Sequence, residues 1–316
     1  MKVARQIISN LLLMLAILLV FNFIAYHYLA KPILYHTYFI PDRAIREHHN
    51  FLLGDSHAEV INQSDLDAIH VLNFSASSES YFDVYAKLNY LLSKTRVDTV
   101  FLAVDNHTLS YYREYSTNQH RSIRYSRYRI HARYYKKNYL RYLFDKYVSI
   151  YLPLFDTGHS KLLGEKIKAV AHGSKPRDYS DFDFSQIPGE TRVRRSDQRV
   201  SMHFPHNIPS KRVTSCLDEI ITLCESSDIE LIGIKFPLTR EFYIHPARIS
   251  YGADSILTAR HHPVLDFEDL YLDRCDFFRD QDHLNNSGST AFVEVWEDTL
   301  RGLPAIPLVS SGEISP

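Results

Sequence analysis

The chain has 316 residues, of which 45% are hydrophobic and 23% are charged, and its net charge is −1. This length suffices for one sizeable core or two small ones. The near-neutral charge excludes a protein that binds polyanions with its whole surface. Its three cysteines, Cys216, Cys224 and Cys275, form neither a disulfide framework nor a metal-binding spacing.

Residues 1–30 have the composition of a transmembrane segment. Lys2 and Arg5 precede a long uncharged apolar run, and about 20 such residues span a bilayer. Because the run lacks a small-x-small cleavage site, an uncleaved signal anchor is favoured over a cleaved signal peptide. The positive charge before the run predicts that the N-terminus lies on the inner side of the membrane and the body on the extracytoplasmic, periplasmic side. Residues 31–49 are then a juxtamembrane linker.

The next part of the chain, from residue 50 to about 303, alternates apolar runs with helical patterns. The runs with strand character are 51–53, 69–74, 97–104 and 229–236. The stretches with helical periodicity are 79–94, with Ser77 or Ser78 as its cap, and 213–224. Strands that alternate with helices predict an α/β fold with a parallel sheet, and the site of such a sheet lies beyond the carboxyl ends of its strands.

Ser56 is the candidate nucleophile. It follows Gly54 and Asp55 at the point where the first strand turns into a helix. A serine here presents its hydroxyl beyond the sheet, beside the unpaired N–H groups of the first helical turn, which suits a nucleophile whose attack creates an oxyanion. The alternative is an ordinary joint in which Asp55 or Ser56 caps the helix.

Asp280 and His283 form a candidate pair of general base and orienting carboxylate near the end of the chain. Histidine titrates in the range that a base for serine requires, and a carboxylate holds its tautomer. Asp282 is a competing orienter on spacing alone. The alternative is a polar loop in which Asn286 or Ser287 caps the last helix, but this gives no reason for the aspartate–histidine pair.

These two blocks, Gly54-Asp55-Ser56 and Asp280-x-x-His283-Leu284-Asn285-x-x-Gly288, resemble the first and last blocks of the SGNH (GDSL-like) hydrolase superfamily. The last block is similar to that of the membrane-anchored SGNH-like proteins of bacterial cell-surface acylation, including the teichoic-acid D-alanylation and alginate acetylation types. The resemblance covers roughly 51–105 and 230–300. It implies a three-layer α/β fold with catalytic Ser56, Asp280 and His283.

The resemblance also implies an oxyanion hole. In the superfamily, a glycine N–H of the second block and an asparagine side chain of the third assist the serine N–H. Here Asn106 would fill the asparagine role, and the glycine position is Ser75 or Ala76, so Ser56, Ser75 and Asn106 are the expected donors. The alternative for Asn106 is a turn residue that ends a strand.

Residues from about 107 to 201 do not fit the alternation and are predicted to be an insertion rich in basic residues and tyrosines. The candidate substrate contacts are Arg124, Tyr125, Arg127 and Tyr128, because tyrosine faces pack on sugar rings and arginines attract anionic polymers. Contact with anionic lipid, or a helical lid with a solvated basic face, remain alternatives. Within the insertion, 175–199 is predicted to be a mobile loop, and 304–316 a flexible tail.

The sequence therefore predicts an extracytoplasmic serine esterase or O-acyltransferase of acetyl type that acts on a cell-envelope polysaccharide. A multi-pass membrane acyltransferase is the expected protein partner, and no nucleic acid is expected. The sequence has no HExxH, GxGxxG or P-loop motif, so neither a metal nor a cofactor is predicted. The alternatives are a non-catalytic envelope component that binds a polysaccharide or a membrane acyltransferase, and a lipid esterase or thioesterase.

Overall fold

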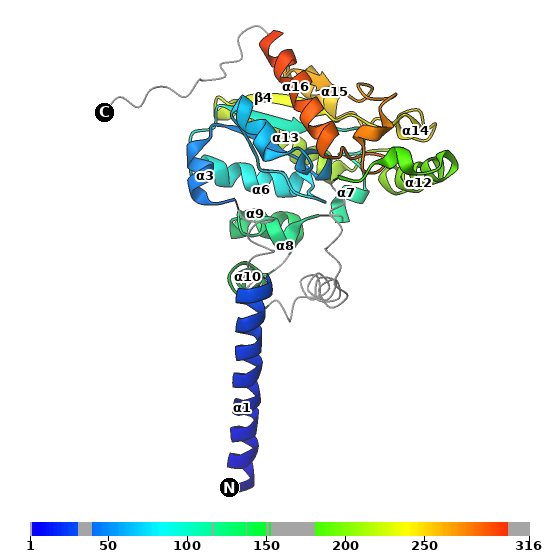
Figure 1. Cartoon of the computed structure of the whole chain (residues 1–316). Coiled ribbons are helices and arrows are strands. Elements are labelled where there is room, and N and C mark those ends of the chain that lie inside the picture. Colours follow the sequence, from blue (N-terminus) through cyan, green and yellow to red (C-terminus); the bar gives the residue numbers. More distant parts are fainter. Residues whose placement is uncertain are drawn as a thin grey trace. The chain divides into compact units, whose positions relative to one another are not determined.

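The computed structural model describes residues 2–30, 40–115, 117–136, 138–149, 152 and 181–302. The chain forms two compact units, and Figure 1 traces it from end to end. The first unit comprises Met1–Ile40 and Ser126–Arg177, and the sheet unit comprises Pro41–Tyr125 and Asp178–Pro316. Most of the predicted linker, 31–39, lies outside the described residues, as do 153–180 of the predicted insertion and the tail 304–316.

The first unit begins with a long apolar helix. α1 (Lys2–Ile24) continues into a π-helical turn, η1 (Ala25–Ala30). The stretch Lys2–Tyr28 is long and apolar enough to cross a membrane, as the sequence predicts. The side of the membrane on which the body lies stays a prediction. The other described elements of this unit are α9 (Tyr128–Tyr135), α10 (Tyr139–Leu143) and η3 (Phe144–Val148).

The sheet unit is built on a parallel sheet of five strands in the order β2-β1-β3-β4-β5. The strands are β1 (Asn50–Leu53), β2 (Val71–Asn73), β3 (Thr99–Ala103), β4 (Glu230–Lys235) and β5 (Val264–Asp266). The predicted α/β fold is thereby confirmed, with β5 as a strand that the sequence pattern did not indicate. In this order the chain changes direction across the sheet between β1 and β3. Ligands of open α/β sheets bind beyond the carboxyl ends of the strands at such a switch point.

Helices cover both faces of the sheet, as right-handed crossovers require. On one face α5 (Gln63–Leu66), which follows β1, packs beside the final helix, α16 (Asn286–Gly302). On the other face α6 (Tyr81–Leu92) packs against α13 (Lys211–Ser226), and α13 also contacts α15 (Ala253–Ala259) (Figure 1). The sheet unit therefore has three layers.

The remaining described elements of the sheet unit are short, apart from α12. They are α3 (Asp42–Glu47), α4 (Ser56–Glu59), η2 (Asp67–Ile69), α7 (Tyr112–Tyr115), α8 (Gln119–Ser122), η7 (Phe184–Gln186), α12 (Gly189–His203), α14 (Arg240–Tyr243) and η8 (Cys275–Phe277). Between β3 and β4 the described residues form helices and no strand; the insertion over 107–201 stays a prediction.

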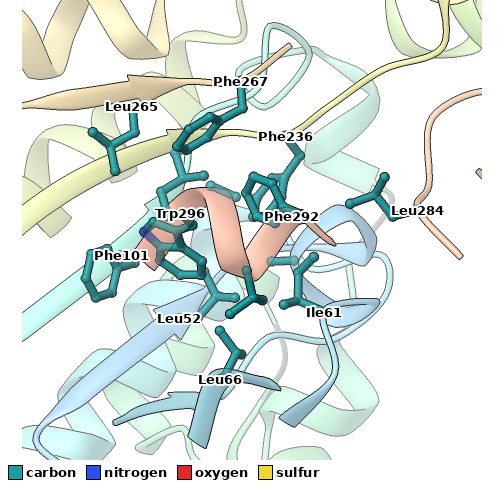
Figure 2. Packing of buried hydrophobic residues seen from close by; sticks show 14 of the residues in the cluster. Leu52, Ile61, Leu66, Phe101, Phe236, Leu265, Phe267, Leu284, Phe292 and Trp296 are labelled. Carbon is teal, nitrogen blue, oxygen red and sulfur yellow. The ribbon is translucent and has the colours of Figure 1, made fainter. Parts of the chain in front are cut away.

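A large apolar cluster fills the space between the sheet and α16. Figure 2 shows Phe292 and Trp296 of α16 among Phe101, Phe236 and their neighbours. The ring centroids of Phe101 and Trp296 lie 5.0 Å apart, and those of Phe236 and Phe292 lie 5.7 Å apart. Because aromatic side chains bury large apolar areas, this packing fixes the first turns of α16 against the sheet. The loop that precedes α16, with His283, is thereby fixed as well.

The prediction of a mobile loop over 175–199 is wrong for its second half. Residues from Gly189 onward belong to α12, and Val200 of that helix is buried against Leu238 and Phe242. Only a narrow face of α12 is apolar, and arginines cover the rest, so the mean polarity of the segment hides the helix. The first residues of that loop prediction, 175–180, lie outside the described residues.

The predicted cap of α6 is also wrong, because Ser80 takes this role rather than Ser77 or Ser78. The Ser80 hydroxyl accepts a hydrogen bond from the Phe82 N–H, and the Asp83 carboxylate accepts one from the Ser80 N–H, at 3.0 Å. Together they form a capping box. The same carboxylate accepts the Asn118 N–H at 3.0 Å, so the helix start also anchors the beginning of the insertion.

Candidate functional site

Ser56 lies at the carboxyl end of β1, where the sheet has its switch point. It is the first residue of α4, and the Asp55 side chain caps this helix by accepting the His57 N–H at 3.0 Å. A Cβ on Gly54 would lie 2.5 Å from the Cβ of Ala103 in β3, so only glycine allows the turn to pass this close to the neighbouring strand. Each residue of the Gly54-Asp55-Ser56 block thus has a local reason for its identity.

The structure brings the two ends of the chain together at Ser56. His283 Nε2 lies 2.8 Å from Ser56 Oγ. On the other side of the ring, His283 Nδ1 lies 2.8 and 3.0 Å from the two oxygens of Asp280. These contacts form a serine–histidine–aspartate chain with the geometry that general-base activation of a serine requires.

Asn285 and Gly288 hold the loop of Asp280 and His283 in place. Asn285 accepts the Gly288 N–H at 2.9 Å and so caps α16. The alternative interpretation of this loop assigns the cap to Asn286 or Ser287. Its amide donates to the backbone oxygen of Asp276 at 2.7 Å. A Cβ on Gly288 would overlap the carbonyl oxygen of Phe277. The Leu-Asn-x-x-Gly end of the block therefore works as a support for the histidine.

Asp282 is a second carboxylate beside His283. Its side chain is fully buried, and one oxygen lies 3.1 Å from His283 Nδ1. Burial alone would raise the pKa of Asp282, but His283 and Arg199 hold this pKa well below its usual value. Burial lowers the pKa of His283, but the charges of Asp280 and Asp282 outweigh burial and raise it. Both carboxylates thus favour the protonated histidine that forms when Ser56 gives up its proton.

Behind Ser56 lies a second buried group of charged side chains. Arg113, from the insertion, forms an ion pair with Asp55 and also contacts His107. Burial alone would raise the pKa of Asp55, but Arg113 and His107 hold it well below its usual value. Burial and the Arg113 cation lower the pKa of His107 to about 4, so this ring is neutral at neutral pH. Asp55 therefore remains an anion where it caps α4.

His57 connects these two groups. Its Nδ1 lies 3.0 Å from Asp105, which follows β3, and its Nε2 lies 3.5 Å from Asp282. The other oxygen of Asp105 accepts the Phe236 N–H at 2.9 Å. Side chains from the ends of β1 and β3 and from the C-terminal loop thus meet beneath Ser56.

The predicted oxyanion donors Ser75 and Asn106 have hydrogen-bond partners in the structure. The Ser75 N–H donates to Asn73 Oδ1 at 3.1 Å, and its hydroxyl donates to the backbone oxygen of Leu52. The Asn106 amide is directed toward Glu268, at 3.5 Å. Their role as oxyanion donors stays a prediction. So does that of the Ser56 N–H, which has no partner within α4 because Ser56 is the first residue of that helix.

The predicted substrate contacts divide between the two units. In the sheet unit, Tyr125 is only 8% exposed, and its ring packs against Phe74 and Tyr90 at 4.7 and 5.1 Å. Its faces cannot stack on a sugar, so this part of the prediction is corrected, whereas Arg124 is half-buried and its role stays a prediction. In the first unit, Arg127 precedes α9 and Tyr128 packs against tyrosines of α10; their role also stays a prediction.

Arg121 is a residue of the insertion that sequence reasoning did not select. It lies 3.6 Å from Glu59, which is one helical turn after Ser56. Burial lowers the pKa of Arg121 to about 9 and raises that of Glu59. A largely buried pair of opposite charges therefore lies at α4, the helix that Ser56 begins. The only sequence signal for it is the position of Glu59 on the same helical face as Ser56.

Two groups of side chains have the spacing of metal ligands. The ligand atoms of His57, Asp105 and His107, and those of His57, Asp282 and His283, lie within 4.8 Å of one another. However, Arg113 contacts His107 and Arg199 lies 3.5 Å from Asp282. Cations this close repel a bound metal ion. The prediction that the site uses neither a metal nor a cofactor stays a prediction.

Comparisons with known proteins do not assign the chain. No family model matches it, and no curated protein matches it significantly.

Proposed function

We propose that this protein is a serine-dependent enzyme that moves an acyl group through Ser56. The observation that carries the proposal is the hydrogen-bonded chain from Ser56 Oγ to His283 Nε2, at 2.8 Å, and from His283 Nδ1 to Asp280, at 2.8 Å. A structural serine has no need of a buried histidine whose far nitrogen faces a carboxylate. The resemblance of both blocks to SGNH hydrolases supports the same reaction class.

In the proposed reaction, His283 Nε2 takes the Ser56 proton while Ser56 Oγ attacks the carbonyl carbon of an ester. Asp280 keeps the remaining proton on Nδ1 and stabilises the imidazolium. The imidazolium then protonates the leaving alkoxide, which departs and leaves an acyl-serine. Water or a sugar hydroxyl, deprotonated by His283, attacks the acyl-serine and restores Ser56. Water gives an esterase, and a sugar hydroxyl gives an O-acyltransferase.

The proposed substrate is a cell-envelope polysaccharide, and the proposed group is of acetyl type. Three observations support this choice: the resemblance of the last block to envelope acylation proteins, the apolar helix over Lys2–Tyr28, and the basic, tyrosine-rich composition of 107–201. A protein anchored by that helix, with its body on the extracytoplasmic side, would meet such a polymer. A multi-pass membrane acyltransferase would supply the acyl group.

One observation favours a second candidate, a non-catalytic component with the same fold. The Ser75 N–H donates to Asn73, and the Asn106 amide is directed toward Glu268, so the oxyanion donors that the resemblance implies are engaged elsewhere. Removing a single oxyanion donor typically costs 10²- to 10³-fold in rate. A chain that keeps both bonds when it binds polysaccharide would hold the polymer or a partner without turnover.

Labelling of Ser56 by a fluorophosphonate probe tests the proposal. The full chain, in detergent, is compared with Ser56→Ala, His283→Ala and the double variant, and Ser64→Ala in α5 is an exposed control. We expect labelling of the wild type and of the control only, and no further loss in the double variant, because the two residues act as a unit. A folded wild-type chain without labelling, or labelling that survives His283→Ala, contradicts the proposal.

A further inference from the structure

His57 lies between two carboxylates. It directly follows Ser56, and its side chain is 2% exposed. Nδ1 lies 3.0 Å from Asp105, and Nε2 lies 3.5 Å from Asp282. A neutral imidazole has one N–H and one lone pair, so a neutral ring would turn its lone pair toward one of the two carboxylates. Only the imidazolium offers an N–H to both.

Both carboxylates also face donors or cations other than His57. Asp105 accepts the Phe236 N–H with the oxygen that does not face His57. Asp282 lies 3.5 Å from Arg199 and 3.1 Å from His283 Nδ1. Donors and positive charge beside a carboxyl group favour its ionised form. The proton shared in this part of the site therefore belongs on the ring of His57.

Neighbouring histidines do not compete for the charge. His107 contacts the guanidinium of Arg113, which repels a second cation. His203 stacks on His107, with ring centroids 4.3 Å apart, and burial lowers the pKa of His203 well below its usual value. Burial would lower the pKa of His57 too, but Asp105 and Asp282 hold that pKa well above its usual value. The charged and titratable groups that face His57 are Asp55, Asp105, His107, Asp282 and His283.

We propose that His57 is a positioning residue, a permanent imidazolium that clamps Asp105 and Asp282 and so holds Asp282 against His283. The inference rests on the proposed function, because its catalytic meaning depends on His283 acting as the base of Ser56. Of the two carboxylates beside His283, Asp282 is fully buried, whereas Asp280 is 27% exposed. Without a cation at His57, Asp282 would have Arg199 as its remaining neighbour of opposite charge.

The clamp also sets the charge of the resting site. With His57 protonated and His283 neutral, the carboxylates of the site outnumber its cations by one; they are Asp55, Asp105, Asp280 and Asp282 against Arg113, Arg199 and His57. Transfer of the Ser56 proton to His283 brings this part of the site to balance. If His57 were neutral, the excess of negative charge would be larger, and His283 would hold its proton to higher pH and be a poorer base at neutral pH.

Histidine-selective ¹⁵N NMR on the full chain in detergent tests the protonation state directly. The His57 signals are assigned by their loss in His57→Gln. We expect both ring nitrogens of His57 to carry protons at every pH over which His283 titrates. A His57 ring that is neutral at pH 7 overturns the inference. Because the NMR measurement needs no reaction at Ser56, its result does not depend on the labelling test of the proposed function.

The pH profile of Ser56 labelling tests the catalytic consequence. In His57→Gln the acid limb of the labelling rate should move to higher pH by on the order of one unit, because a cation 4.9 Å from the His283 ring is gone. His206→Gln, at an exposed histidine, should leave the limb in place. A loss of rate without an upward shift would assign His57 a merely structural role and overturn the inference. A protonated His57 in a wild-type chain that is not labelled would overturn the proposed function, and with it the catalytic meaning of the clamp.

Discussion

The exchange of Asp280 for asparagine separates the charge of this side chain from its role in orienting His283. Asp280 Oδ1 accepts the backbone N–H of His283 at 2.9 Å and that of Asp282 at 3.1 Å. In Asp280→Asn these two N–H donors require an acceptor, so the amide oxygen, and not the NH₂ group, takes the position of Oδ1. That oxygen would lie 2.8 Å from His283 Nδ1 and would still accept its proton. The tautomer that leaves Nε2 free for Ser56 is therefore retained.

The expected loss is that of one charge. A hydrogen bond to a charged group contributes about 1.5–3 kcal/mol, which is about 10- to 150-fold in rate at about 1.4 kcal/mol per factor of ten. In triads where the same exchange of aspartate for asparagine reverses the histidine tautomer, the rate falls by about 10⁴-fold. The smaller figure applies here because the Asp282 carboxylate remains 3.1 Å from Nδ1.

The assay is the second-order rate of fluorophosphonate labelling at a pH above the raised pKa of His283. Asp273→Asn is the matched control, because the Asp273 side chain is 86% exposed. A loss near 10⁴-fold in Asp280→Asn would refute the retained tautomer. A loss below about threefold would refute Asp280 as the orienter. A larger loss in Asp282→Asn than in Asp280→Asn would transfer that role to Asp282.

Two further predictions concern His283 and the loop that carries it. The labelling rate should fall on acidification with a midpoint above pH 6.5, because His283 must be neutral to accept a proton and Asp280 outweighs burial to raise its pKa; a midpoint below 6.5 contradicts this. Gly288→Ala should lower the free energy of unfolding by about 1–3 kcal/mol in chemical denaturation, because its Cβ would overlap the Phe277 carbonyl oxygen. Gly302→Ala, where a Cβ meets nothing within 4 Å, should leave the free energy of unfolding unchanged. Equal losses of stability in the two variants would contradict the steric argument.

The parts of the fold that were open to prediction are those with a local pattern. β1 and β3 are buried along their whole length, and strands of a parallel sheet covered on both faces read as continuous apolar runs. β5, Val264–Asp266, has one buried residue between a half-buried and an exposed one, so it has no pattern to detect. α12 is hidden for the opposite reason, since a long helix with a narrow apolar face has the mean polarity of a loop.

The candidate site was predictable to the same extent. Ser56 and His283 belong to short motifs from which a nucleophile and a base can be predicted. The fold brings Ser56 Oγ and His283 Nε2 to 2.8 Å from each other. The spacing of the last block does not decide whether Asp280 or Asp282 orients His283. In the structure both carboxylates lie beside the same nitrogen of that ring, Nδ1. Arg113 and Arg199 carry no sequence signal, because each is one arginine among many in a basic segment and meets its partner only through tertiary folding.

The proposed acyl-transfer reaction needs a site with two halves, one for the histidine cation and one for the oxyanion. The described residues supply the half that stabilises a cation on His283, through Asp280, Asp282 and the network behind them. In the half that would stabilise an oxyanion, the predicted donor at Ser75 gives its N–H to Asn73. If Ser75 is the donor, an active chain must free its N–H from Asn73 when substrate or a partner binds, at the cost of about one hydrogen bond. A non-catalytic chain keeps the bond, so the state of the Ser75 N–H with bound polysaccharide is the physical difference between the two candidate functions.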